Sequence, residues 1–240
     1  MTLDEQQLEE RGFFYLVSSQ KLTVGMFQFR QGAKTEPHAH PNSEACDYCV
    51  AGKGNIEVNG EAHELTPGMA IHVPAGAYHS YQCLSREPFR FIGCIDTQRA
   101  FRQLRPGEAP PSEPGMNATV LSREEGRVAT SDGRTSILLI EPWRVHAKTI
   151  GLGYARYEAA SMPGQTHSHG DLEEAIYVLS GNGQCWLGSE IADIEAGQAV
   201  DIPPGAPHRV EVSGPSPLEF LLVYSPPRGA WYQGEYPPEL

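Results

Sequence analysis

The sequence predicts an all-β protein that consists of two similar domains of antiparallel strands. Three observations support this fold class: one set of motifs occurs twice, turn residues recur about every 8 to 12 positions, and glycine and proline are abundant. The 240 residues include 25 glycines and 20 prolines, a composition that suits short strands joined by tight turns. A chain of this length can form two cores of roughly 100 residues each.

The repeated motifs are separated by a constant offset of 129 residues. Eight identities at one offset indicate that a single fold unit has been duplicated. Six of the nine histidines belong to the repeat, so the duplication preserves a cluster of imidazoles as well as a backbone. The first copy contains His38, His40, Gly52, Gly54, Gly68, Pro74, Gly76 and His79, and the second contains His167, His169, Gly181, Gly183, Gly197, Pro203, Gly205 and His208.

Strand and turn signals give the expected elements. A short helix is predicted over residues 4–11, and strands begin at Phe13. Residues 105–115, RPGEAPPSEPG, have the composition of a linker. Strand and turn segments are predicted over 21–29, 47–54, 55–60, 61–68, 69–79 and 88–95, and strands resume at 136–143 and continue to 220–227. The expected divisions are a first domain over residues 13–97, a linker over 98–134, a second domain over 135–226 and a tail over 227–240.

Charge and hydropathy restrict the partners. The formal charge of −12 disfavours nucleic acid and anionic membranes, because both require basic patches. The sequence contains no run of about 18 apolar residues, so it predicts no membrane span. The acidic segment MTLDEQQLEERG lacks the positive region and apolar run of a signal peptide. We therefore expect a cytoplasmic protein that binds neither nucleic acid nor membrane.

The cysteines predict a reduced protein. Their number, 5, is odd, which argues against a disulfide framework. Cys46 and Cys49 form a CxxC sequence, but the stretch CDYCVAG is typical of a strand. Residues three apart in a strand point to opposite faces, so we do not expect these two thiols to share a ligand.

The repeated motifs resemble a known family. Residues 32–52 have the pattern G-x5-H-x-H-x3-E with a glycine eight positions later, and residues 68–79 have the pattern G-x5-P-x-G-x2-H. These patterns resemble the two sequence motifs of the cupin superfamily, and their recurrence in the second half is similar to a bicupin. The resemblance implies two double-stranded β-helix (jelly-roll) barrels in tandem.

The histidines predict a metal site in each half. Two histidines separated by one residue in an extended strand project to the same face, here the barrel interior. A third histidine after the PxG turn can complete a set of nitrogen ligands. With one carboxylate the set suits iron(II), manganese, nickel or zinc and leaves coordination positions open. The expected ligands are His167, His169, His208 and Glu174 in the second domain, and His38, His40 and His79 in the first.

The choice between Glu173 and Glu174 follows from the cupin resemblance and from strand alternation. Cupin motifs place the ligand glutamate seven positions before the closing glycine, and Gly181 then selects Glu174. Because neighbouring residues in a strand face opposite sides, Glu173 is expected to face solvent. The shorter spacing of Glu173 from His169 keeps the alternative open.

The first domain departs from the cupin pattern at the carboxylate. With the offset of 129, Ala45 stands where the second domain has Glu174. Asp47 lies on the same strand face as position 45, and Glu44 would reach inward if the preceding loop were one residue tighter. A three-histidine site, with one of these carboxylates as a possible substitute, is therefore the expectation for this half.

The cupin resemblance implies several activities. We expect a metal-dependent enzyme that acts on a small organic molecule, in the first instance a non-haem iron(II) dioxygenase in which Glu173 or Tyr177 moves protons. The alternatives are a non-redox isomerase, cyclase or aminohydrolase that uses zinc, nickel or manganese, and a non-catalytic binding protein. The apolar segment PLEFLLVYSP and the aromatic tail predict a homodimer.

Overall fold

The computed structural model describes residues 6, 8, 9, 12–97, 108, 117–159 and 161–227. The first half of the chain forms barrel one from two sheets, in the orders β1-β2-β8-β3-β6-β9 and β5-β4-β7. Its strands are β1 (Phe13–Ser18), β2 (Leu22–Phe29), β3 (Ala45–Ala51), β4 (Gly54–Val58), β5 (Glu61–Leu65), β6 (Met69–Val73), β7 (His79–Cys83), β8 (Phe89–Asp96) and β9 (Thr119–Ser122).

The second half forms barrel two with the same plan. Its sheets have the orders β10-β11-β12-β18-β13-β16 and β15-β14-β17. The strands are β10 (Arg127–Ser131), β11 (Arg134–Ile140), β12 (Gly151–Tyr157), β13 (Glu173–Ser180), β14 (Asn182–Leu187), β15 (Glu190–Glu195), β16 (Ala199–Ile202), β17 (His208–Val212) and β18 (Leu218–Ser225). The short helix η1 (Arg123–Glu125) lies between β9 and β10, and the short helix α2 (Pro142–Val145) lies between β11 and β12.

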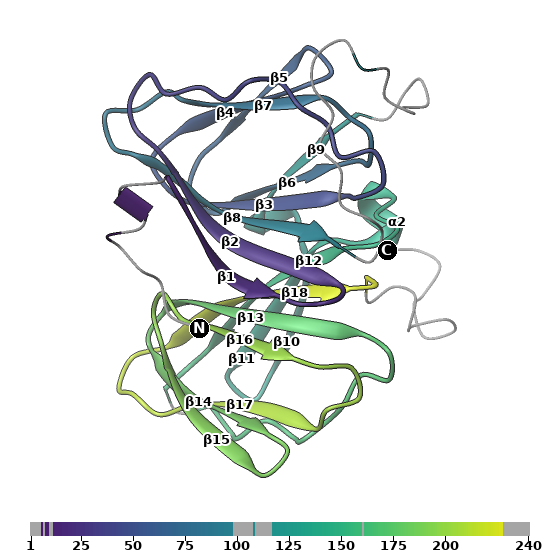
Figure 1. Ribbon diagram of the computed structural model, residues 1–240. Coiled ribbons are helices and arrows are strands. Elements are labelled where there is room, and N and C mark those ends of the chain that lie inside the picture. Colours follow the sequence, from purple (N-terminus) through teal and green to yellow (C-terminus); the bar gives the residue numbers. More distant parts are fainter. Residues whose placement is uncertain are drawn as a thin grey trace.

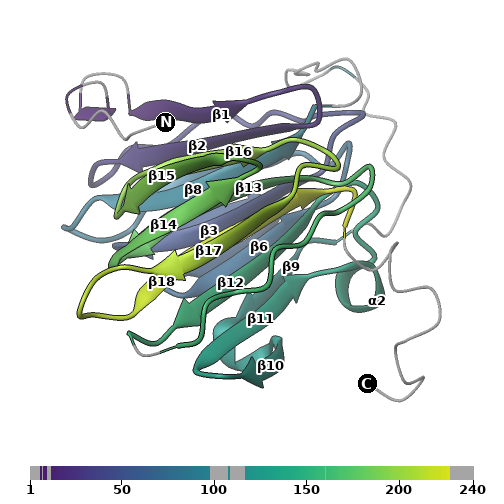
Figure 2. The same cartoon turned by 90° about the horizontal axis from the view of Figure 1, so that it is seen from below.

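The four sheets are stacked in layers. Figure 1 shows the small sheet of each barrel at an outer end and the two six-stranded sheets facing each other in the middle. The view from below in Figure 2 shows the strands of barrel two in front of those of barrel one. The all-β fold class with two tandem barrels, predicted from the repeat, is confirmed.

Three apolar cores hold the layers together. One core fills each barrel, and a third lies between the barrels, where it takes residues from both six-stranded sheets. We call these the barrel-one, barrel-two and interdomain cores. Strand alternation assigns each side chain to one of them: in β3, Ala45 and Cys49 enter the barrel-one core, whereas Cys46 and Tyr48 enter the interdomain core. Each six-stranded sheet therefore buries residues on both faces.

The same alternation settles the CxxC sequence. Cys46 and Cys49 lie on opposite faces of β3, as predicted, and all five cysteines are free and buried. Burial raises the pKa of both thiols, which keeps them protonated. No metal-binding or redox role follows from this sequence.

Two sequence-based expectations about the elements need correction. The predicted linker, residues 98–134, contains β9, which pairs with β6 in barrel one, and β10, which pairs with β11 in barrel two. Strand β18, which was expected to offer an edge to a second chain, is hydrogen-bonded to β12 and β13 on its two sides. Because it lies inside the sheet, β18 cannot pair with another molecule.

Other expectations fall on residues that the structure does not describe. These are most of the helix over 4–11 and the aromatic tail from residue 228 onward.

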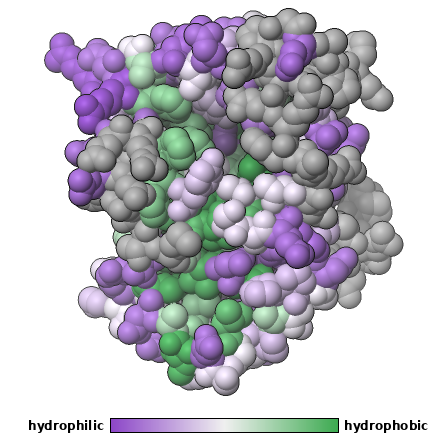
Figure 3. All heavy atoms as spheres, in the orientation of Figure 1, coloured by the Kyte–Doolittle hydropathy of each residue, from purple (hydrophilic) through white to green (hydrophobic). Residues whose placement is uncertain are grey.

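Within the described ranges, no helix is both long enough and apolar enough to span a membrane. Figure 3 shows hydrophobic residues reaching the surface of both barrels among hydrophilic ones.

Candidate metal centres

The main chain builds the same scaffold in both barrels. His38 and His79 exchange two backbone hydrogen bonds, with N···O distances of 3.0 and 2.8 Å, and His167 and His208 exchange the same pair at the same distances. This isolated bridge joins the segment that carries the HxH motif to the beginning of β7 or β17. The first histidine of the motif and the distal histidine are thus held side by side.

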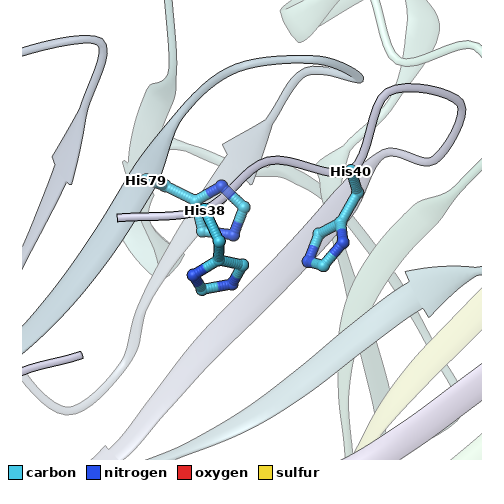
Figure 4. Close-up of side chains that lie close together, drawn as sticks. All are labelled: His38, His40 and His79. Carbon is cyan, nitrogen blue, oxygen red and sulfur yellow. The ribbon is translucent and has the colours of Figure 1, made fainter. Parts of the chain in front are cut away.

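The three imidazoles of each barrel converge. Ring centroids of His38 and His79 lie 4.4 Å apart, as do those of His167 and His208. The remaining centroid separations are 5.1 and 5.3 Å in barrel one and 4.8 and 5.0 Å in barrel two. Figure 4 shows the barrel-one trio, with His38 and His79 adjacent and His40 facing them from the neighbouring loop.

Hydrogen bonds to the main chain orient four of the six rings. The Nδ1 atoms of His38 and His79 donate to the carbonyl oxygens of Glu36 and Ala77, at 3.1 and 3.0 Å. In barrel two, the Nδ1 atoms of His167 and His208 donate to Gln165 and Ala206, at 3.0 and 2.9 Å. Since a carbonyl oxygen only accepts, Nδ1 carries the proton and Nε2 keeps its lone pair, as a metal ligand requires.

Burial lowers the pKa of three of these imidazoles. It lowers the pKa of His79 to about 3, helped by the neighbouring rings of His38 and His40. Burial also lowers the pKa of His38 and of His167. Each barrel brings one nitrogen from each of its three histidines within 4.8 Å of one another, close to twice the metal–nitrogen distance of about 2.1 Å. The donor type and spacing therefore fit a divalent transition metal.

Barrel two adds a carboxylate to its histidines. The Glu174 side chain is 2% exposed, and its Oε2 lies 3.0 Å from His169 Nε2 and 3.4 Å from His208 Nε2. Its neighbours on the same face of β13, Ile176 and Val178, belong to the barrel-two core. Strand parity therefore turns Glu174 toward the histidines, the orientation anticipated from the motif spacing.

Barrel one has a different acid. Ala45 occupies the position of Glu174, and the carboxyl of Asp47, two residues further along β3, accepts a hydrogen bond of 2.8 Å from the Tyr81 hydroxyl. Asp47 is 2% exposed, and burial raises its pKa to about 7. Asp47 and Tyr81 line a cavity whose wall also includes His38, His40 and His79.

The other two glutamates considered as ligands, Glu44 and Glu173, point away from the histidine trios. Glu44 Oε2 accepts hydrogen bonds from the Lys148 and Thr149 amides, at 2.8 and 2.7 Å, and from the Thr149 hydroxyl at 3.0 Å. Glu173 accepts a hydrogen bond from the Ser19 hydroxyl. Ser19 belongs to the first half of the chain and Thr149 to the second, so each glutamate crosses between the barrels.

These contacts correct the roles expected for Glu173 and Tyr177. Glu173 was expected to face solvent, but it is buried because barrel one covers that face of β13. Tyr177 lies in the interdomain core, and burial raises its pKa to about 12. Both residues are on the face of β13 opposite Glu174, so neither is placed to move protons at the histidines of barrel two.

The polar pair in barrel one was only partly anticipated. Asp47 was considered as a substitute ligand, but its partner Tyr81 was not considered. The signal was present in the repeat: with the offset of 129, Asp47 and Tyr81 match Ile176 and Val210. The shared scaffold does not require Asp47 and Tyr81, because the second copy has apolar residues at the same positions. Such differences inside the barrel are therefore informative.

A family model described as a cupin domain matches residues 25–95 and 153–224, which together exceed half of the chain. The chain belongs to the cupin family. One matched segment lies in each barrel, from β2 to β8 and from β12 to β18, and the matches leave out β1, β9, β10 and β11. The bicupin organisation inferred from the repeat is thereby confirmed.

Two curated proteins are similar to this chain over short segments. The chain is 38% identical over 61 residues to the uncharacterized protein MJ1618 of Methanocaldococcus jannaschii, covering 25% of this chain and 49% of that protein. It is 32% identical over 72 residues to quercetin 2,3-dioxygenase of Bacillus subtilis, covering 28% of this chain and 21% of the enzyme. The chain thus matches half or less of the length of these relatives.

Solved bicupin structures share the fold over most of the chain. Oxalate decarboxylase of Lactobacillus farciminis, solved as a formate complex, has a TM-score of 0.70 at 16% identity and covers 87% of this chain and 78% of that one. A putative glyoxylate-induced protein of Pseudomonas aeruginosa has a TM-score of 0.68 at 16% identity, with coverages of 89% and 79%. At such identities the similarity establishes the fold alone.

Proposed function

We propose that this bicupin is a metal-dependent enzyme that acts on a small organic molecule, and that its reaction is an oxygenation by non-haem iron(II). The observation that carries the proposal is the position of Glu174, which faces two histidine nitrogens in barrel two. Together with His167 it gives a donor set of three nitrogens and one oxygen. This set suits iron(II), and manganese, nickel and zinc are its competitors.

Barrel two has the features that a reactive centre needs. His208 and Glu174 are buried, whereas His167 is exposed, so a small molecule can approach the histidines from the side of His167. The Glu174 carboxylate neutralises part of a dication's charge, and the imidazoles add none. A bound iron(II) supplies Lewis acidity and one-electron redox chemistry at its open positions.

The similarity to quercetin 2,3-dioxygenase over 72 residues supports the choice of an oxygenation. That support is local, since the match covers 21% of the enzyme.

The test combines metal analysis with oxygen consumption. Protein purified anaerobically and loaded with iron(II) should consume oxygen in the presence of a substrate from a panel of small acids, diketones and phenols. Glu174→Gln should abolish this uptake, and Glu173→Gln should retain both metal and uptake because Glu173 faces barrel one. Turnover without oxygen uptake in the zinc, nickel or manganese form would move the protein to a non-redox class. Protein that binds no metal would contradict the proposal.

A further inference from the structure

Barrel one contains a cavity of about 440 Å³. Cavities of this size hold small organic ligands in other proteins. Its lining includes the trio His38, His40 and His79, the Asp47–Tyr81 pair, and the rings of Phe27, Phe29 and Phe91. The cavity is thus polar at one part of its wall and aromatic at another.

The aromatic part is a set of nearly parallel rings. Phe91 stacks on Phe27 at 5.2 Å with an interplanar angle of 7°, and on Tyr81 at 4.9 Å with an angle of 10°. Tyr81 in turn stacks on Phe29 at 6.0 Å with an angle of 8°. We call Phe27, Phe29, Tyr81 and Phe91 the aromatic wall.

Two glycines allow the wall to lie close to the sheet. Gly25 and Gly93 are Cα partners in the β2–β8 pair. A Cβ atom at Gly93 would lie 2.7 Å from the Phe27 ring and 3.2 Å from the Asp47 carboxyl, so a side chain there would displace both. In barrel two the matching partners are Gly153 and Leu222, and Leu222 belongs to the core.

Tyr81 connects the wall to the polar part of the cavity. Its ring centroid lies 5.7 Å from that of His79 and 6.4 Å from that of His38, and its hydroxyl donates to Asp47. The matching residues of barrel two, Ile176 and Val210, are both apolar and lie in its core. The two barrels therefore share a histidine trio but differ in what surrounds it.

From this arrangement we infer that barrel one is a second, separate ligand site, and that its ligand is a flat conjugated ring carrying a hydroxyl or carboxyl group. The ring lies with its face against the aromatic wall, because rings that stack on one another cover each other's faces and leave their edges for a ligand, and the positive edge of one ring attracts the negative face of another. The oxygen substituent faces Asp47 and the histidine nitrogens, which are among the polar groups of the lining. This inference rests on barrel one alone and does not depend on the metal of barrel two.

The experiment uses 2-naphthol as the probe and decahydro-2-naphthol as its saturated counterpart. Both carry one hydroxyl on a fused two-ring skeleton, but the saturated molecule is not flat and has no π-system. Calorimetric titration of the full chain should give one 2-naphthol site per chain, with binding of the saturated compound weaker by about tenfold or more.

A matched pair of variants locates the site. Phe91→Leu removes a ring of the wall, and Phe220→Leu makes the same change at the corresponding buried position of barrel two. The first should weaken 2-naphthol binding at least tenfold, and the second should leave it unchanged. Similar losses of melting temperature in the two variants would show that the difference is not one of folding.

A measurement on the unmodified protein covers the case in which Phe91→Leu does not fold. Saturating 2-naphthol should shift the backbone amide resonances of Gly25 and Gly93 and leave that of Gly153 in place. The inference is overturned if 2-naphthol does not bind, if the saturated compound binds equally well, or if the shifts appear at Gly153 instead.

Discussion

Replacement of Glu44 by alanine should destabilise the whole chain, because this carboxylate joins the two barrels. Its Oε2 accepts three hydrogen bonds, from the Lys148 amide, the Thr149 amide and the Thr149 hydroxyl. Hydrogen bonds to a charged group contribute about 1.5 to 3 kcal/mol each, and neighbouring bonds are not additive. We therefore expect a loss of about 3 to 5 kcal/mol, a large part of the usual stability of a domain.

The charge state of Glu44 adds a pH dependence. Burial acts to raise its pKa, but His72 and the two amides outweigh burial, so the pKa is lowered. A carboxyl whose pKa is lower in the folded state stabilises the fold above its unfolded pKa, and that contribution is lost as the pH falls below about 4.5. The difference between wild type and Glu44→Ala should accordingly shrink in acid.

Urea denaturation followed by circular dichroism measures the effect. With a slope of about 3 kcal/mol per molar urea, the midpoint should fall by roughly 1 to 1.7 M at pH 7. Glu173→Ala is the matched control, since Glu173 crosses the interface through the Ser19 hydroxyl, and it should cost about 1 to 2 kcal/mol. A loss below about 1 kcal/mol for Glu44→Ala at pH 7 would refute the reasoning.

Three further predictions concern the metal, acid and turns. Ala45→Glu supplies barrel one with the missing carboxylate and should create a second tight metal equivalent, measurable by competition with a chromophoric chelator; unchanged stoichiometry would contradict it. Metal-free protein should lose stability as the pH falls from about 6.5 toward 3, because the folded pKa of His79 lies below its unfolded value, and urea midpoints for His79→Gln should fall less over this range. Gly181→Ala should cost at least about 3 kcal/mol of stability, since φ is +83° and a Cβ would lie 2.2 Å from the Pro217 carbonyl oxygen. The control Gly188→Ala, at φ +59° with open space around it, should cost about 1 kcal/mol. Equal melting temperatures of the two variants would exclude this explanation.

The histidine geometry could be predicted because it is local. Residues separated by one position in extended chain share a face, which brings the two histidines of HxH together, whereas the distal histidine was added from the resemblance to the cupin motifs. The orientation of Glu174 follows from the same alternation once its neighbours Ile176 and Val178 are assigned to the core. The repeat then gave both barrels from one argument.

The surroundings of Glu173 and Tyr177 could not be predicted in this way. Alternation places both on the outer face of β13, but it does not reveal that the other barrel covers that face. The segment at Thr119–Ser122 was assigned to the linker because a strand of four residues beside a proline-rich stretch gives a weak signal. Its partner β6 is about 50 residues away in sequence, and such pairings are not visible in local composition.

The crossing glutamates have the pattern of a two-fold contact. Glu44 of the first half accepts hydrogen bonds from residues 148 and 149 of the second half. Glu173, its counterpart at the repeat offset, accepts one from Ser19 of the first half, and Ser19 is the counterpart of residue 148. A contact in which the same patch meets its own copy is the isologous type found in symmetric homodimers. In a homodimer every substitution appears on both sides, whereas a single chain that contains both copies can vary each side independently. This freedom allows one barrel to carry Glu174 while its twin carries Ala45, Asp47 and Tyr81 on the same backbone.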